Sequence, residues 1–158
     1  MGSRLPPPDW WATASGQQDG LPVIYRYRQN RPNAADYRDY PHALRVRWGY
    51  DRQRRSGLPP ADVNDAQRDF EAAIEPLGDC AAGYLMLVLT GNGRKEWIYY
   101  IRDLDAWLDQ FNACLEDHEP YPIVLDDWPD PDWSTWQRFT DSVRASQDPG
   151  RQPSAATL

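Results

Sequence analysis

Two early segments of the chain alternate between apolar and arginine side chains, and this period of two is the strongest constraint that the sequence places on the fold. Residues 23–28 have apolar side chains at the odd positions, and residues 43–50 have them at the even positions. The intervening positions carry the arginines of both segments: Arg26, Arg28, Arg45 and Arg47. Because successive side chains of a strand point to opposite faces, each segment predicts a β-strand with a buried aromatic side and an exposed arginine side.

The rest of the chain adds both helix and strand patterns. Apolar residues recur at helical spacing in three segments: residues 61–77, 104–115 and 131–143. In the last of these, Asp130 is predicted to cap the helix and Pro131 to be its first residue. Strand patterns cover three more segments: residues 84–89, 95–101 and 121–125. The sequence Thr-Gly-Asn-Gly at 90–93 predicts a tight turn with positive φ angles.

The order of these segments, β-β-α-β-β-α-β-α, predicts an α+β domain. Residues 43–125 have the β-α-β-β-α-β order of a ferredoxin-like split βαβ sheet, with an extra N-terminal strand and a C-terminal helix. The strand at 43–50 is central in that topology, so the first strand cannot pair with it as a hairpin. A repeated strand-strand-helix unit, in which the first two strands do pair, is the alternative. In both arrangements we expect an antiparallel or mixed sheet with its helices on one face.

A length of 158 residues fits one domain. We expect a loose N-terminal arm over residues 1–20, with Trp10 and Trp11 docked on the domain, a single α+β domain over 21–144 and a disordered tail over 145–158. Cys80 and Cys114 have no metal or redox spacing and are expected to be reduced, half-buried thiols.

The charge of the chain is acidic and unevenly distributed. Its net charge is −7, but residues 1–55 hold ten Arg and five Asp, whereas residues 56–158 hold seven basic and nineteen acidic residues. An acidic protein is a poor nonspecific binder of nucleic acid or anionic membranes. The sequence shows no secretory signal and no apolar stretch long enough to span a bilayer, so we expect a cytoplasmic location. It also contains no catalytic motif and none that implies a cofactor.

The most acidic segment, residues 116–132, contains no Lys or Arg. Its carboxylates are Glu116, Asp117, Glu119, Asp126, Asp127, Asp130 and Asp132. Three interpretations are open: helix caps and solvated charge, a site for a divalent cation, or a surface for a basic protein partner. Trp128 lies in the same segment and is a candidate interface anchor, because exposed tryptophans often dominate binding.

The four strand arginines form the second candidate site. If their two strands are neighbours, four guanidiniums share one sheet face, where like charges destabilise the sheet unless something offsets them. Pairing with the acidic C-terminal third of the chain is the leading interpretation. Protein binding is the second and RNA binding the third, because the aromatic residues alternate away from the arginines instead of presenting a stacking surface for bases.

Three groups of residues resemble a bacterial family known as domain of unknown function 695. They are Arg31 with Asn33 and Tyr40-Pro41 before Leu44-x-Val46-x-Trp48-x-Tyr50; Thr90-Gly91-Asn92-Gly93-Arg94-x-Glu96-Trp97-x-x-Tyr100; and Asp130-Pro131-x-Trp133-x-x-Trp136. The resemblance spans residues 23–139 and implies an architecture similar to regulator of ribonuclease activity B, a ferredoxin-like protein that inhibits an endoribonuclease by binding it. It supplies no catalytic residues.

Together these features favour a non-enzymatic module that binds a basic protein partner and regulates or neutralises it, for example an immunity protein or an inhibitor of a basic toxin or nuclease. The partner-binding candidates are the acidic segment with Trp128 and the four strand arginines. The alternatives are a metal-assisted hydrolase that uses the loop 116–132, and an RNA-binding regulator that uses an arginine-rich sheet face.

Overall fold

The computed structural model of the chain describes residues 11–32, 37–51 and 57–146. Its strands are β1 (Trp11–Gln18), β2 (Leu21–Arg28), β3 (His42–Gly49), β4 (Asp79–Cys80), β5 (Gly83–Gly91), β6 (Arg94–Ile101) and β7 (Ile123–Pro129). Its helices are α1 (Ala61–Ile74), α2 (Leu104–Cys114) and α3 (Ser134–Ser146), with short 3-10 turns η1 (Tyr37–Asp39) and η2 (Glu75–Gly78). The predicted α+β class is confirmed, and each predicted helix and strand overlaps an observed one.

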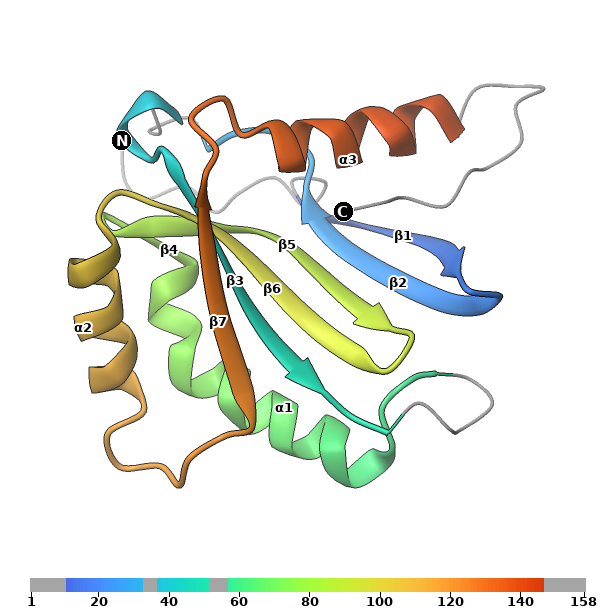
Figure 1. Ribbon diagram of the computed structural model, residues 1–158, viewed down its shortest axis with the longest axis horizontal. Coiled ribbons are helices and arrows are strands. Elements are labelled where there is room, and N and C mark those ends of the chain that lie inside the picture. Colours follow the sequence, from blue (N-terminus) through green and yellow to red (C-terminus); the bar gives the residue numbers. More distant parts are fainter. Residues whose placement is uncertain (1–10, 33–36, 52–56, 147–158) are drawn as a thin grey trace, which may run out of the picture.

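The strands form one sheet in the order β1-β2-β5-β6-β3-β7, with the two-residue β4 paired to β5 (Figure 1). Every neighbouring pair is antiparallel. The extra N-terminal strand β2 therefore pairs with β5, and β5 and β6 separate it from β3. The alternative arrangement, in which the first two predicted strands pair with each other, is wrong.

Helices cover both faces of the sheet, so the expectation of helices on one face is also wrong (Figure 1). The α1–α2 face buries a core that includes Val46, Phe70 and Trp107. The α3 face buries a second core, which includes Tyr25 and Phe139. The cause lies in the central strands β5 and β6, which are apolar on both sides and must be covered on both.

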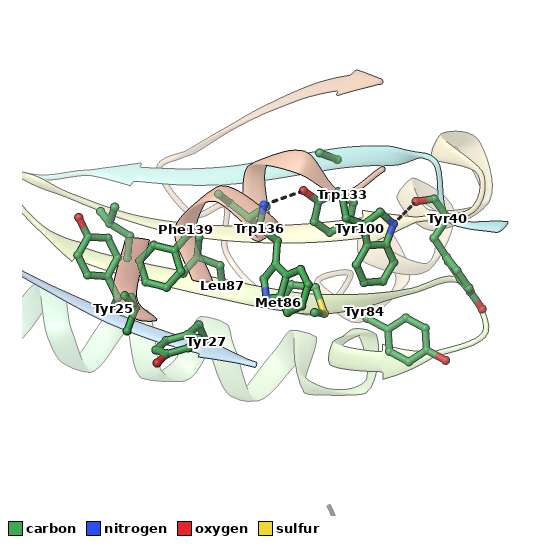
Figure 2. Packing of buried hydrophobic residues seen from close by; sticks show 14 of the residues in the cluster. Tyr25, Tyr27, Tyr40, Tyr84, Met86, Leu87, Tyr100, Trp133, Trp136 and Phe139 are labelled. Atoms are coloured by element: carbon green, nitrogen blue, oxygen red, sulfur yellow. Dashed lines mark hydrogen bonds between the residues drawn. The ribbon is translucent and has the colours of Figure 1, made fainter. Parts of the chain in front are cut away.

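An aspartate and a tryptophan fix α3 on the sheet. The carboxylate of Asp130 accepts hydrogen bonds from Tyr100 Oη (2.7 Å) and from the backbone nitrogens of Ser134 (2.8 Å) and Thr135 (3.0 Å). Trp133 stacks on Tyr100 with ring centroids 4.5 Å apart, and its Nε1 donates to Tyr40 O (Figure 2). Asp130 does cap the helix, but the helix begins at Ser134, three residues later than predicted. Trp133 has a positive φ of 56° that turns the chain before the first helical residue.

The segment 11–18 is a strand, not part of a loose arm. Its alternation is carried by the small residues Ala12 and Ala14, which pack against the α3-face core. A two-residue turn at Asp19-Gly20, with φ angles of 52° and 78°, joins β1 to β2. Trp11 docks on the sheet as expected, whereas Trp10 lies outside the described residues. At the other end, α3 includes residues 145 and 146 of the predicted tail, and 147–158 lie outside the described part.

The predicted turn after β5 is confirmed, with positive φ at Asn92 (49°) and Gly93 (84°). This turn meets the β1–β2 turn, because Asn92 Nδ2 donates to Asp19 Oδ2 over 3.1 Å. Gly91, the last residue of β5, has a φ of 144°, and a Cβ atom on this residue would lie 2.5 Å from Pro22 O. A residue without a side chain is therefore required for β2 to approach β5 at this point.

Candidate functional site

The four strand arginines do not share a sheet face. Val23, Tyr25 and Tyr27 of β2 point to the α3 face, so Arg26 and Arg28 point to the α1–α2 face. On β3 the parity is reversed: Leu44, Val46 and Trp48 point to the α1–α2 face, and Arg45 and Arg47 therefore lie on the α3 face. The condition for a single arginine-rich surface, that β2 and β3 are neighbours, is not met.

The arginines of β3 are paired with carboxylates directly across the sheet. Arg45 lies opposite Asp126 of β7 and donates to it through Nε (3.0 Å) and Nη2 (2.6 Å). These hydrogen bonds raise the pKa of Arg45, and its guanidinium also lies over the Trp128 ring at 5.4 Å. Arg47 lies opposite the buried Glu96 of β6, with 3.8 Å between Nε and Oε2. This part of the α3 face is a ladder of opposite charges.

The arginines of β2 have a different environment. Arg28 is buried and donates to Leu85 O (2.8 Å) and Gly78 O (3.1 Å), with Asp79 at 3.6 Å. Burial lowers its pKa, while Asp79 acts in the opposite direction. Arg26 has a half-exposed side chain and lies 3.8 Å from Glu71. Both guanidiniums lie over the ring of Trp11, and both line a cavity beside α1.

The leading interpretation of the arginine cluster was internal pairing with the acidic C-terminal third, and it is correct only in part. Each has a carboxylate of this chain within 4 Å. Only Arg45 finds its partner in the acidic C-terminal third, however. The other partners, Glu71, Asp79 and Glu96, come from the middle of the chain.

Most of the predicted acidic segment lies on the surface along one end of the molecule. Glu116, Asp117 and Glu119 are exposed in the loop between α2 and β7. Asp126 and Asp127 are exposed on β7, but they point to opposite faces of the sheet. Trp128 is half-buried under the Arg45 guanidinium.

Asp130 differs from the rest of the acidic segment because it is only 5% exposed. Burial alone would raise the pKa of this carboxyl group, but hydrogen bonds from Tyr100, Ser134 and Thr135 outweigh that effect and lower it. Its two oxygens serve the start of α3. Asp130 therefore presents no carboxylate to a partner at the surface, although the sequence alone placed it with its acidic neighbours.

The acidic region is larger than the predicted segment. Residues 103–132 contain ten Asp and Glu and no Lys or Arg, and they fold into α2, the following loop and β7 (Figure 1). We call the exposed carboxylates on α2, the following loop and β7 the acidic edge: Asp105, Asp109, Glu116, Asp117, Glu119, Asp126 and Asp127. Asp105 and Asp109 were missed as site residues. The signal for them was present, because the stretch without basic residues begins at Asp103, which caps α2 through Ala106 N.

The acidic edge includes a sheet edge, since β7 has no strand on its outer side among the described residues. Asp130 N donates to Pro41 O, and the register continues through His42 with Pro129 and Leu44 with Asp127. Antiparallel pairs alternate between hydrogen-bonded and non-hydrogen-bonded positions. The backbone groups of Leu125 and Asp127 therefore point away from β3, and the proline ring of Pro129 replaces an N–H that would also point outward.

Within residues 11–32, 37–51 and 57–146, no three His, Cys, Asp or Glu side chains lie together as a group that could hold a metal ion. The carboxylates of the loop 116–132, all of them described, thus form no donor set. None of the helices formed by the described residues is long and apolar enough to cross a membrane.

The residues that carry the family resemblance have structural roles. Leu44, Val46 and Trp48 fill the α1–α2 core, residues 90–100 form the β5–β6 turn and strand β6, and Asp130, Trp133 and Trp136 anchor α3. Asn33 lies outside the described residues. A comparison with curated proteins found no match. The model of a family of unknown function, DUF695, matches residues 9–140, and the chain therefore belongs to this family.

Proposed function

We propose that the protein is a cytoplasmic, non-enzymatic binding module whose acidic edge docks a basic, extended segment of a partner protein. The observation that carries this proposal is the coincidence of an open sheet edge with an uninterrupted acidic stretch, residues 103–132. Open edges are used in many complexes to add a strand from a partner, with backbone hydrogen bonds giving affinity and side chains giving specificity. Here the side chains on both sides of the edge select for positive charge.

The topology supports this role for β7. We infer that β3-α1-β5-β6-α2-β7 is a ferredoxin-like split βαβ unit, because its strand order β7-β3-β6-β5 and its two helices on one face follow that pattern. Strands β1 and β2 extend this unit beyond β5, on the side opposite to β7. The N-terminal extension therefore lengthens the sheet away from the acidic edge and leaves β7 exposed.

The negative charge of the edge raises the rate of association with a basic partner and determines which partners can bind. Six of the seven carboxylates of the acidic edge, all except Asp126, form no salt bridge with a described residue. Clustered charges of one sign steer an oppositely charged partner toward the edge and repel acidic proteins. An inhibitor or immunity protein that neutralises a basic toxin or nuclease is the form of this function that we favour.

The arrangement gives less support to the two alternatives. An RNA-binding face needs its arginines together, and here they occupy opposite faces and strands three positions apart in the sheet order. A metal-assisted hydrolase needs converging carboxylates, whereas Asp126 and Asp127 diverge and Asp130 is committed to α3. Neither alternative is favoured by a specific observation.

The charge requirement is tested by affinity capture from the native host with the full chain and two charge-matched variants. Glu116→Lys/Glu119→Lys alters the acidic edge, and Asp65→Lys/Asp69→Lys makes the same change in net charge on the exposed side of α1. We expect one basic partner to be captured by the wild-type and α1 variants and lost by the edge variant. Equal capture by all three proteins would contradict the proposal.

Strand addition is tested separately at Asp127, whose backbone points outward. Asp127→Pro removes an outward N–H without removing a hydrogen bond to β3, and Asp127→Asn removes the same charge while keeping the N–H. We expect the proline variant to lose the partner and the asparagine variant to retain it with weaker binding. If the two variants bind equally, the partner docks on side chains and not on the strand.

A further inference from the structure

A cavity of about 500 Å³ lies on the α1–α2 face of the sheet, at the end of the molecule away from β7. It is bounded by β1 and β2 on one side and by the C-terminal end of α1 with η2 on the other. The side chains of Leu85, Trp97 and Tyr99 contribute to its lining from the central strands. A concave site of this volume with an apolar floor is the usual setting for a small ligand.

The two walls of this cavity carry opposite charges. The strand wall contributes Arg26 and Arg28, and the helix wall contributes Glu71, Glu75 and Asp79. No Asp or Glu on β2 or β1 interrupts the positive wall next to the cavity, and no Lys or Arg occurs between residues 69 and 93 on the negative wall. The cavity therefore has a positive and a negative side facing one another.

Two of these charges are held in place by the protein itself. Arg28 is 3% exposed and is committed to the carbonyl oxygens of Leu85 and Gly78. Glu71 accepts hydrogen bonds from Trp97 Nε1 at 2.9 Å and from Lys95 Nζ at 3.3 Å. These contacts fix the positions of both charges, which set the electric field in the cavity.

The remaining three charges can meet a ligand. The Arg26 side chain is 50% exposed, lies over the Trp11 ring at 5.0 Å, and is separated from Glu71 by 3.8 Å, which is too long for a hydrogen bond. Its guanidinium is thus oriented in advance by the ring and keeps donors for a carboxylate. Opposite it, the Asp79 side chain is 58% exposed, and Glu75 is exposed without a salt bridge to any described residue.

We propose that this cavity binds a zwitterionic ligand of amino-acid or dipeptide size. Arg26 takes the carboxylate, Glu75 and Asp79 take the ammonium group, and the apolar part of the ligand lies on Leu85 and Ile74. A ligand with one charge interacts with only one of the two walls and gains nothing from the other, so it binds more weakly than a ligand with both charges. The cavity is therefore selective for molecules that carry both charges.

This inference does not depend on the acidic edge. The cavity and β7 lie at opposite ends of the sheet order, and they share no residue. Variants of the acidic edge should leave ligand binding unchanged, and variants of the cavity should leave partner capture unchanged. Failure of either experiment therefore leaves the other proposal standing.

Isothermal titration of the full chain with three forms of one dipeptide tests the proposal: Gly-Leu, N-acetyl-Gly-Leu and Gly-Leu-amide. Gly-Leu carries both charges, N-acetyl-Gly-Leu carries only the carboxylate, and Gly-Leu-amide carries only the ammonium group. We expect Gly-Leu to bind with a Kd of about 1 mM or tighter, and each of the other forms to bind at least about tenfold more weakly. No binding of Gly-Leu, or equal binding of all three forms, would overturn the proposal.

Matched variants place the binding in the cavity. Arg26→Gln and Glu75→Gln should each weaken Gly-Leu binding about tenfold or more, and Arg26→Gln should abolish the preference for Gly-Leu over Gly-Leu-amide. Arg47→Gln is the control, because its side chain is 55% exposed and lies on the other face of the sheet. Circular dichroism establishes that each variant is folded. Gly-Leu binding that survives Arg26→Gln unchanged would refute the site.

Discussion

The arginine pairs of β2 and β3 begin from the same sequence pattern and end in different surroundings. On β3, both cross-strand neighbours supply carboxylates: Asp126 opposite Arg45 and Glu96 opposite Arg47. On β2, the residue opposite Arg28 is Trp11, and the residue opposite Arg26 on β5 is Val88. The charge of β3 is thus neutralised within the plane of the sheet, whereas that of β2 is left to an aromatic ring and to groups on α1 and η2.

The difference shows that alternation determines which face a side chain occupies but not what it meets there. The neighbour is decided by the sheet order, which places β6 and β7 beside β3 and places β1 and β5 beside β2. Where a neighbour has a carboxylate at the matching position, the arginine completes a cross-strand pair. Where the neighbouring strand has no such carboxylate, the arginine contacts groups on the helices instead. On β2 these contacts border a cavity.

The largest difference between the pairs should appear at Arg28. Arg28→Met keeps much of the side-chain volume but leaves the buried carbonyl oxygens of Leu85 and Gly78 without their donor. Unsatisfied buried groups cost about 1–3 kcal/mol each, so we expect a loss of about 2–4 kcal/mol in the free energy of unfolding, measured by urea denaturation.

Arg28→Lys is the matched variant, since it retains the charge but cannot reach both carbonyl oxygens with a rigid fork. It should recover less than half of the loss. A cost below about 1 kcal/mol for Arg28→Met would mean that Arg28 contributes no more to the free energy of unfolding than the arginines of β3.

The second largest effect should be found at Glu96, the buried carboxylate of the β3 ladder. Its side chain is 5% exposed and lies 3.8 Å from both Arg47 and Arg94. Glu96→Gln preserves the shape and removes the charge, leaving the mostly buried Arg94 without compensation. Because Arg47 is half-exposed and neither contact is a hydrogen bond, we expect Glu96→Gln to lower the free energy of unfolding by about 1–2 kcal/mol. This is less than the cost of breaking a fully buried pair. Urea denaturation of Glu96→Gln beside Arg47→Gln checks this, and equal costs would contradict it.

The elements of the fold were largely predictable, because apolar periodicity is a local property. Every predicted strand and helix overlaps an observed one. Two strands were missed, β1 and the two-residue β4, and the longer of them explains the limit. In β1 the half-buried positions include Ala12, Ala14 and Gly16, which are too small to give an apolar signal. The turn sequence Asp19-Gly20 was the available signal, since Asp-Gly is typical of two-residue hairpins.

The candidate site was less predictable than the fold, because it depends on which strands become neighbours. The acidic edge was largely found from the sequence, since its residues are contiguous along the chain. The carboxylates that meet the arginines of β2 and the cavity between them come from segments about 45 to 50 positions away, such as Glu71 and Asp79. Asp130 shows the converse: its sequence neighbours are exposed, but contacts with Tyr100 and α3 bury it.

A smaller effect is expected for the bidentate pair of β3. Arg45→Ala and Asp126→Ala should each cost about 0.5–1 kcal/mol, because both side chains are partly exposed and water replaces much of the interaction. A double-mutant cycle should give a favourable coupling at about 0.1 M salt that decreases at about 1 M salt, where the screening length is about 3 Å. A coupling that does not change with salt would show that Trp128 packing, not charge, holds Arg45.

The smallest effect is expected at Arg26, which is the position where stability and binding should separate. Its guanidinium lies 3.8 Å from the Glu71 carboxylate, and its side chain is 50% exposed, nearly the same as the 55% of Arg47. Arg26→Gln should therefore change the free energy of unfolding by less than about 0.5 kcal/mol, the same as Arg47→Gln, in parallel urea denaturations. A cost close to that of Arg28→Met would mean that the guanidinium is fixed on Trp11 as part of the fold and cannot turn toward a ligand. A cost near zero leaves Arg26 as a charge that the sheet does not need, held by an aromatic ring at the mouth of a cavity.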